Sequence, residues 1–249
     1  MSAPVIVTWS ERPDLGERSW EEMEDVWPEY NGQGDVMRPL WARIDVDFPA
    51  FQFLLYDEEA DEILAKGHSL PVAWDGTLEG LPAGIDGAIT GGFRLRDEGE
   101  DPNTLSAMAV EVPTRNQNRG LSRVMIGAMR DLAEAHGLTN LIAPVRPSWK
   151  ERYPLTPIDR YVAWTRDDGL PFDPWIRVHI RLGGEILQTE PHSLCVTGTV
   201  AEWEQWVGMR FPESGEYVFP QGLAPLTVDV DADLGSYWEP NVWMRHRVT

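Results

Sequence analysis

Apolar residues recur every three to four positions in four stretches of this chain, and that spacing predicts a helix in each. The stretches are residues 18–30, 121–136, 173–182 and 200–209. The first has an acidic outer face. Gly137 follows the second, at the position where many helices end. We therefore expect four helices that each bury one face.

Other stretches are rich in strand-forming residues. Residues 51–57 and 62–73 flank a short acidic segment and predict an antiparallel hairpin. Residues 105–112 and 138–147 are nearly continuous apolar runs, which are typical of strands buried on both faces. Residues 78–92 are rich in glycine and are interpreted as a long surface loop.

The middle of the chain has the order strand, loop, helix, strand. Residues 105–112 lead into a loop that contains Gly120, and the helix and the strand of residues 138–147 follow. A strand, a crossover helix and a second strand form a unit whose two strands run parallel. We expect these two strands to lie side by side in one sheet.

The loop of this unit is basic in an otherwise acidic chain. Residues 112–130 hold no acid, whereas the formal net charge of the whole chain is −20. The first amides of a helix are unpaired and its dipole is positive there, so a loop with a glycine completes an anion site, with phosphate as its natural occupant. In the alternative interpretation the arginines only cap and solvate a surface loop. The arginines are Arg115, Arg119, Arg123 and Arg130.

The composition of the chain indicates which partners it could bind and where in the cell it is located. The 41 acidic residues against 21 basic ones argue against binding to nucleic acid or an anionic membrane, and favour cationic partners such as amines. The single cysteine, Cys195, allows no internal disulfide and fits a cytoplasmic protein. The first residues do not resemble a signal peptide, and no apolar run approaches the roughly 18 residues of a membrane helix.

The basic loop matches neither of the two common nucleotide-binding patterns, G-x-x-x-x-G-K-[ST] and G-x-G-x-x-G. It is similar to the pyrophosphate-binding motif Q/R-x-x-G-x-G/A of the Gcn5-related N-acetyltransferases. Gln117, Gly120 and Ser122 stand at the three fixed positions of that motif. Ser122 replaces the usual second glycine or alanine, but it is small and could cap the helix. The resemblance covers roughly residues 15–190.

This resemblance implies an α/β acyl-CoA N-acyltransferase fold, with a mixed, mostly antiparallel sheet flanked by helices. It implies acetyl-CoA or another acyl-CoA as cosubstrate, a small-molecule amine as acceptor, and no metal. The loop would bind the pyrophosphate, and the preceding strand would pair with the pantetheine arm. The implied binding residues are Ala109, Val110, Val112, Gln117, Asn118, Arg119, Gly120, Leu121 and Ser122.

Direct attack of an amine on the thioester needs a base for the amine and benefits from an acid for the departing thiolate. The family often places a tyrosine as the acid four residues before a Gly-Phe pair. Here His179 stands four residues before Gly183, with Gly184 in place of phenylalanine, so His179 is the leading acid candidate. Tyr161 and Tyr153 are rivals for that role.

Glu111 is the candidate base. It lies on the strand of residues 105–112, on the face opposite Val110 and Val112, so it faces either the cleft or solvent.

Three further features of the sequence predict no additional site. The run Asp229, Asp231, Asp233 resembles a calcium loop, but its glycine comes one place late, so a polar strand or turn is favoured. The five histidines lack the spacing of a zinc site, and Cys195 is interpreted as a packing residue.

The chain is divided into a domain of residues 1–190 and an extension, residues 191–249, that completes the sheet or forms a small lobe. Two alternatives to an acetyltransferase stay open: a non-catalytic acyl-CoA sensor, and an enzyme that uses a longer acyl chain or a non-amine acceptor. The oligomeric state is also open, a homodimer included.

Overall fold

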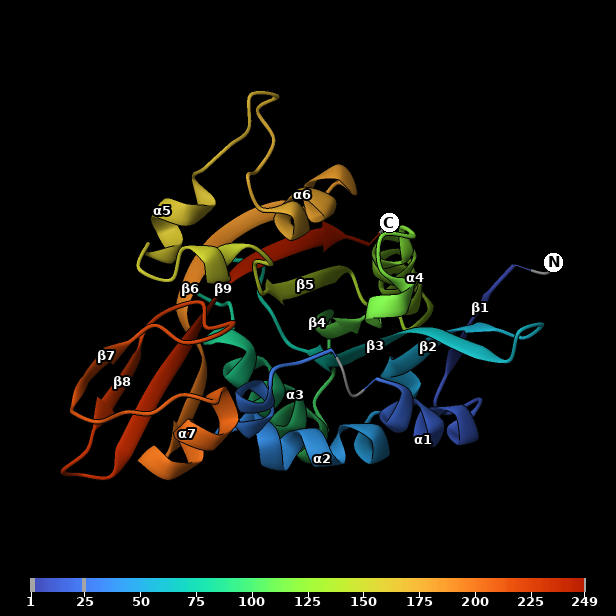
Figure 1. The fold of residues 1–249 in the computed structure, drawn as a ribbon. Coiled ribbons are helices and arrows are strands. Elements are labelled where there is room, and N and C mark those ends of the chain that lie inside the picture. Colours follow the sequence, from blue (N-terminus) through green and yellow to red (C-terminus); the bar gives the residue numbers. More distant parts are fainter. Residues whose placement is uncertain (1–2, 24–25, 249) are drawn as a thin grey trace.

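The computed structural model describes residues 3–23 and 26–248, and the strands among them form a single mixed sheet. The strands run in the order β1-β2-β3-β4-β5-β9-β8-β7, and β6 also pairs with β9 (Figure 1). Only β4 and β5 are parallel; the other pairs are antiparallel. The strands are β1 (Val5–Thr8), β2 (Gln52–Asp57), β3 (Glu62–Val72), β4 (Thr104–Glu111), β5 (Asn140–Val145), β6 (Glu185–Gly198), β7 (Gly215–Tyr217), β8 (Leu226–Asp229) and β9 (Leu234–Arg247).

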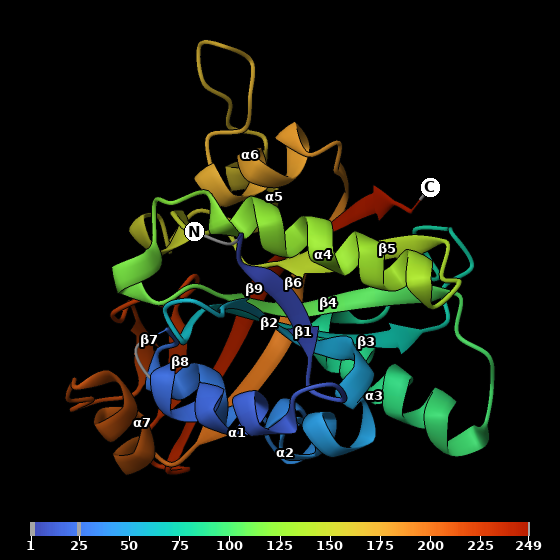
Figure 2. The ribbon, with the colours of Figure 1, turned by 90° about the vertical axis from the view of Figure 1, so that its right-hand side faces the viewer.

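Helices cover both faces of this sheet. Helices α1 (Pro13–Glu22), α2 (Met37–Asp47) and α3 (Gly84–Glu98) lie below it in Figure 1, and α4 (Leu121–Ala135), α5 (Ile158–Val162) and α6 (Pro174–Arg181) lie above it. Figure 2 shows α4 running along the sheet on the side opposite α1, α2 and α3. Helix α7 (Val200–Val207) packs beside β8 and β9. This layered α/β architecture is the predicted one.

Several predicted elements are confirmed. The hairpin consists of β2 and β3, and β4 and β5 flank α4 as predicted. Gly137 follows α4 with φ 71°, the left-handed conformation of a residue just beyond a helix end. The Asp173 side chain caps α6 by accepting hydrogen bonds from the amides of Trp175 and Ile176.

The prediction of a surface loop over residues 78–92 is wrong, because α3 begins at Gly84. The glycines there allow close packing instead of a turn. A Cβ on Gly92 would lie 1.9 Å from Leu70 Cδ1, and one on Gly84 would lie 2.2 Å from the Cα of Ser193. The missing side chains let α3 approach β3 and β6.

The first helix also differs from the prediction. It covers Pro13–Glu22 instead of residues 18–30, and residues 24–25 lie outside the described residues. Residues Glu29–Gln33 form a short 3-10 helix, η1, after Pro28. Proline lacks a backbone N–H, so one helix does not continue through Pro28 to residue 30.

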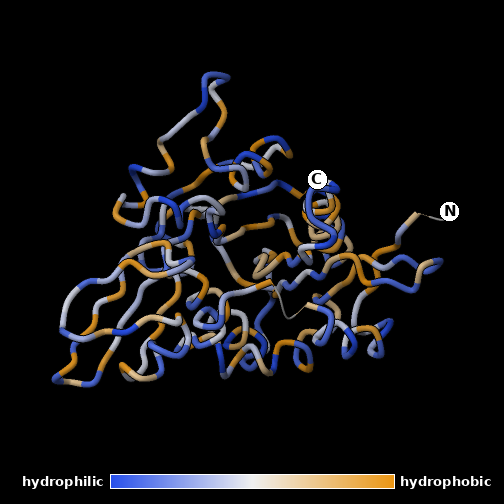
Figure 3. Tube along the Cα trace, in the orientation of Figure 1, coloured by the Kyte–Doolittle hydropathy of each residue, from blue (hydrophilic) through white to orange (hydrophobic). Residues whose placement is uncertain are grey.

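The segment from β5 to α6 carries α5 and a loop that extends from the molecule. Figure 3 shows the tip of this loop, between α5 and α6, as hydrophilic. The predicted division at residue 190 falls inside β6, whose residues pair with β9. Within the described part of the chain, no helix combines the length and the apolar character that a membrane crossing requires.

The parallel strands β4 and β5 stay together only briefly. They pair at three positions, from Thr104 and Asn140 to Ser106 and Ile142, and then separate. On its other edge β4 continues to pair with β3 as far as Glu111, with a register shift at Met108. A β-bulge of this kind bends its strand. The sheet therefore opens between the carboxyl-terminal halves of β4 and β5.

The close contact at Gly92 gives a stability prediction. Gly92→Ala should lower the free energy of unfolding by about 1–3 kcal/mol, because the new methyl group overlaps Leu70. Gly91→Ala is the matched control: it adds the same group in the same helix where nothing lies within 4 Å, and should stabilise by about 0.5–1 kcal/mol. Denaturant unfolding measures both; equal effects of the two substitutions would contradict the packing argument.

Candidate active site

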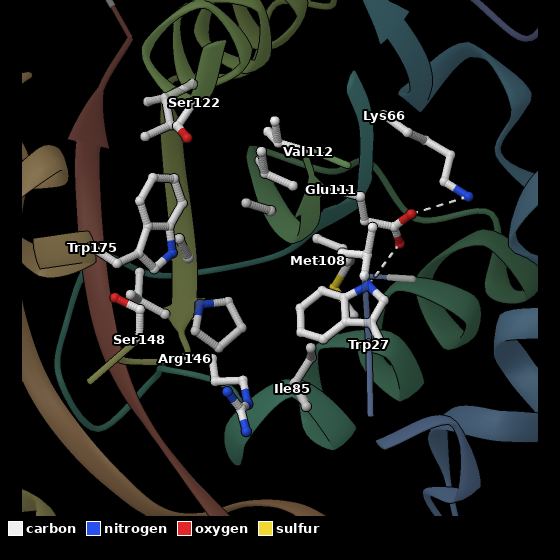
Figure 4. A pocket seen from close by; sticks show the side chains of 18 of the residues that line it. Trp27, Lys66, Ile85, Met108, Glu111, Val112, Ser122, Arg146, Ser148 and Trp175 are labelled. Carbon is white, nitrogen blue, oxygen red and sulfur yellow. Dashed lines mark hydrogen bonds and ion pairs between the residues drawn. The ribbon is translucent and has the colours of Figure 1, made fainter. Parts of the chain in front are cut away.

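A cavity of about 1020 Å³ lies where β4 and β5 separate. Figure 4 shows its two walls, with Glu111 of β4 on one side and Ser148 and Trp175 on the other. One end reaches the loop before α4, and the other reaches α1, α2 and the segment between them. The implied binding residues that line it are Ala109, Val110, Val112, Gln117, Asn118, Gly120, Leu121 and Ser122.

The loop before α4 presents backbone amides that the protein does not use. Gly120 is the N-cap residue of α4 with φ 76°, and Asn118 also has a positive φ of 62°. Among the residues that the structure describes, none accepts a hydrogen bond from the amides of residues 118–122. The cap is thus Gly120 and not Ser122, which is the second residue of the helix. Free amides at a positive helix end are suited to an anion.

Side chains fix the shape of this loop. Gln117 Nε2 donates to the carbonyl of Val112 at 3.2 Å, and Arg119 Nη1 donates to Asn116 Oδ1 at 2.6 Å. Asn116 is buried and donates to Glu62 Oε1 at 3.1 Å. Arg119 is exposed and does not belong to the lining of the cavity, but its guanidinium adds positive charge beside the free amides.

Glu111 is buried and faces the cavity with its carboxylate held from two sides. Trp27 Nε1 donates to Oε1 at 2.9 Å, and Lys66 Nζ lies 3.1 Å from Oε2 (Figure 4). Lys66 is directly opposite Glu111 in the pairing of β3 and β4, so the two side chains emerge on the same face. His68, two residues further along β3, has Nε2 3.9 Å from Glu111 Oε1.

The Lys66 ammonium is fully enclosed. It lies 4.0 Å from the ring centre of Trp20, which also lines the cavity. Burial raises the pKa of Asp45, on α2, to about 7, and the Lys66 charge opposes that rise. Burial also lowers the pKa of His68, whose Nδ1 lies 2.9 Å from Gln52 Oε1, so His68 is neutral. The sequence analysis did not predict Lys66 and His68 as residues of the site. A lysine and a histidine within an otherwise apolar strand are unusual, and this pattern could have indicated them.

His179 also lines the cavity, on α6. It is buried, and its Nδ1 lies 2.9 Å from His246 Nε2 on β9. Burial and the neighbouring imidazole lower the pKa of His179 to about 3. Trp175 contacts the His179 ring edge to face, with 4.5 Å between ring centres. Sequence reasoning missed His246, because nothing near residue 246 resembles the motif.

The two tyrosines lie elsewhere. Tyr161 is buried among the side chains between α5, α6 and β5, and its hydroxyl donates to Asp173 Oδ2 at 2.8 Å. Burial raises the pKa of Tyr161 above its usual range. The rings of Tyr153 and Tyr161 are in contact, with 6.0 Å between their centres. Neither lines the cavity, so we assign both to the packing of this segment.

A second ion pair, also missed from the sequence, lies at the cavity wall below β5. Arg146 Nε lies 3.0 Å from Glu239 Oε1 on β9, and Arg146 Nη2 donates to Tyr30 Oη at 3.0 Å. Asn31 Nδ2 donates to Glu239 Oε1 at 3.1 Å. Both charges are thus neutralised by the protein, and they join η1 to the end of β5 and to the interior of β9.

The remaining candidates do not form sites. Asp229 Oδ1 accepts hydrogen bonds from the amides of Asp231 and Ala232, which makes this run a turn. Across residues 3–23 and 26–248, no three His, Cys, Asp or Glu side chains are grouped as metal ligands would be. Burial raises the pKa of Cys195 to about 12, so its thiol is protonated at neutral pH.

Comparison with known proteins gives a sequence relative and a shared fold. A search of protein-family models matches none to this chain. Arginine N-acetyltransferase avaD of Aspergillus versicolor is 28% identical over 273 residues, which cover 98% of this chain and 93% of that protein.

Two solved structures share the architecture over nearly their whole length. The loading GNATL domain of CurA from Lyngbya majuscula has a TM-score of 0.60 at 16% identity, and covers 99% of this chain and 98% of its own. The GphF GNAT-like decarboxylase in complex with isobutyryl-CoA has the same TM-score and identity, and covers 98% and 100%. The shared fold and the sequence similarity to an N-acetyltransferase both support the resemblance to the Gcn5-related N-acetyltransferases.

Proposed function

We propose that this protein transfers an acetyl or other short acyl group from acyl-CoA to the amine of a small molecule. The observation that carries the proposal is the cavity itself. It runs from the unpaired amides before α4, between the separated strands, to the carboxylate of Glu111. An anion-binding end and a carboxylate end within one cavity suit a substrate with a diphosphate at one end and a reacting thioester at the other.

The edge of β4 that faces β5 supports binding of the pantetheine arm. Beyond Ser106, β4 no longer pairs with β5, although it still pairs with β3. The backbone groups of β4 beyond Ser106 that face away from β3 therefore lack a strand partner. Polar backbone groups need a partner when they are buried, and the amides of a pantetheine arm would supply one. The thioester carbonyl would accept a hydrogen bond from a β4 amide, which stabilises the oxyanion of the attack.

Glu111 would take the proton from the attacking amine. Each of its oxygens has one protein donor, Trp27 or Lys66, and a carboxylate oxygen can accept more than one hydrogen bond. Lys66 Nζ, 3.1 Å from Oε2, is the countercharge of this carboxylate inside the protein. The amine would then attack the thioester carbon directly, without a covalent enzyme intermediate.

Aromatic side chains around Glu111 support a cationic acceptor. Trp20, Trp27 and Trp41 all line this end of the cavity. Indole faces attract ammonium and guanidinium groups, and the relative avaD is by name an arginine N-acetyltransferase. We therefore propose an acceptor that carries a positive charge in addition to its reactive amine.

His179 is the proposed source of the proton for the departing thiolate, since it lines the wall opposite Glu111. We also propose a cytoplasmic location, which the unpaired thiol of Cys195 supports, because extracellular proteins usually form disulfides.

The anion site gives a binding prediction. Coenzyme A at about 100 times its dissociation constant should add about 2.7 kcal/mol to the stability of the protein, measured as a thermal shift. Arg119→Glu places a negative charge beside the free amides and should weaken that binding about tenfold or more. Arg166→Glu is the control, with the same change of charge on an exposed turn away from the cavity. Equal shifts in both variants, or a shift with ATP alone, would contradict the proposed site.

The role of Glu111 gives a kinetic prediction. Glu111→Gln should lower kcat for acetyl transfer about 100-fold, with a small effect on the KM for acetyl-CoA. The variant leaves Lys66 buried without its countercharge, so it should also be less stable.

The double variant Glu111→Gln/Lys66→Met removes both charges and separates the two effects. Its thermal stability should recover, whereas its kcat should stay low. Recovery of kcat together with stability would show that Glu111 acts only through the fold.

A further inference from the structure

His179 and His246 form a buried imidazole pair beside the cavity. We propose that this pair is a proton relay, in which His246 supplies a proton to His179 while His179 protonates the departing thiolate. The inference rests on the proposed acyl transfer and adds a residue, His246, to its machinery.

The hydrogen-bond pattern of the pair is that of a relay. His179 Nδ1 and His246 Nε2 are 2.9 Å apart, so one proton is shared between them. The outer nitrogen of each ring, Nε2 of His179 and Nδ1 of His246, is buried and has no partner within the described part of the chain. Both residues line the cavity. Each end of the pair thus carries a nitrogen without a protein partner, where a proton would enter or leave.

The absence of a side chain at Gly184 leaves space for the His246 ring. A Cβ on Gly184 would lie 2.8 Å from His246 Cε1 and 3.0 Å from its Nε2. The same Cβ would lie 2.8 Å from the carbonyl oxygen of His179, to which the Gly184 amide donates a hydrogen bond. A glycine is therefore required at position 184 for His246 to reach His179.

A single histidine in this environment is a poor acid. Burial lowers the pKa of His179 to about 3 and that of His246 to about 4, so both rings are neutral at neutral pH. A neutral imidazole that gives up its only N–H proton becomes an imidazolate, which is a far stronger base than a thiolate. The imidazolate is avoided when the other nitrogen of the ring gains a proton at the same time.

The relay provides that second proton. When the C–S bond breaks, its electron pair goes to sulfur and the proton on His179 Nε2 moves to the thiolate. The proton on His246 Nε2 moves to His179 Nδ1, and His246 Nδ1 takes a proton from a water molecule that enters through the cavity, which His246 lines. Both rings are neutral before and after the step, with their tautomers exchanged. The proton that the amine nitrogen releases balances the proton that the thiol gains.

The charged groups near His179 and His246 favour neutral imidazole rings. Arg130 of α4 is the charged group that acts on His246, and it disfavours a second positive charge there. Over residues 3–23 and 26–248, no carboxylate lies within 4.0 Å of either ring nitrogen. Trp175 covers the His179 ring. Nothing at this position would hold either ring as an imidazolium.

The substitution His246→Gln distinguishes a proton relay from a role in which His246 only positions His179. Its side-chain amide can keep the hydrogen bond to His179 Nδ1, as donor or as acceptor, but it cannot exchange tautomers. His246→Gln should lower kcat at least tenfold, with an unchanged KM for acetyl-CoA and a thermal stability close to that of the unmodified protein. His246→Phe should lower kcat to the same extent. If His246→Gln retains full kcat, the relay is overturned.

Nitrogen-15 NMR of the histidine side chains tests the relay independently of catalysis. In the unmodified protein without ligands, the shifts should place the proton on Nε2 of both rings, because these are the tautomers from which the relay starts. Protons fixed on Nδ1 of both rings would overturn the relay, whether or not acyl transfer is observed. Absence of acyl transfer with the protons on Nε2 would instead contradict the proposed function and leave the proton relay standing.

Discussion

The separation of β4 from β5 is the constraint on which the rest of this structure depends. Parallel strands in a sheet normally satisfy each other's backbone groups along their whole length, and here that pairing ends after Ser106 and Ile142. The bulge at Met108 bends β4 away from β5. On its other edge, β4 keeps its hydrogen bonds to β3 as far as Glu111. The cavity and the unpaired backbone edge are direct consequences of that separation.

Charge inside this opening is arranged in pairs. Glu111 with Lys66, and Glu239 with Arg146, place four charged side chains at or near the cavity wall with little exposure. Removal of one partner from such a pair is costly, whereas the intact pair is tolerated because each charge has its counterpart. Each of these two carboxylates therefore has its countercharge within the protein.

The sequence predicted what depends on local order and missed what depends on contacts across the sheet. The strand, basic loop, helix and strand around Gly120 are contiguous, so periodicity and the motif located them. Lys66, a partner of Glu111, and His246, the partner of His179, are distant from them in sequence. Strand pairing brings Lys66 to Glu111, and the position of α6 beside β9 brings His179 to His246. The α3 helix was mistaken for a loop because its glycines reflect packing against Leu70 and Ser193, which the sequence does not reveal.

The departure from the family pattern near His179 becomes intelligible in this structure. The resemblance places a tyrosine and a Gly-Phe pair where this chain has His179, Gly183 and Gly184. A side chain at position 184 would occupy the space of the His246 ring, so phenylalanine and His246 exclude each other. A tyrosine can donate its own proton, whereas a buried neutral histidine needs a second group to replace the proton it gives up. The two replacements are therefore parts of one change, in which the room gained at Gly184 admits the partner that His179 requires.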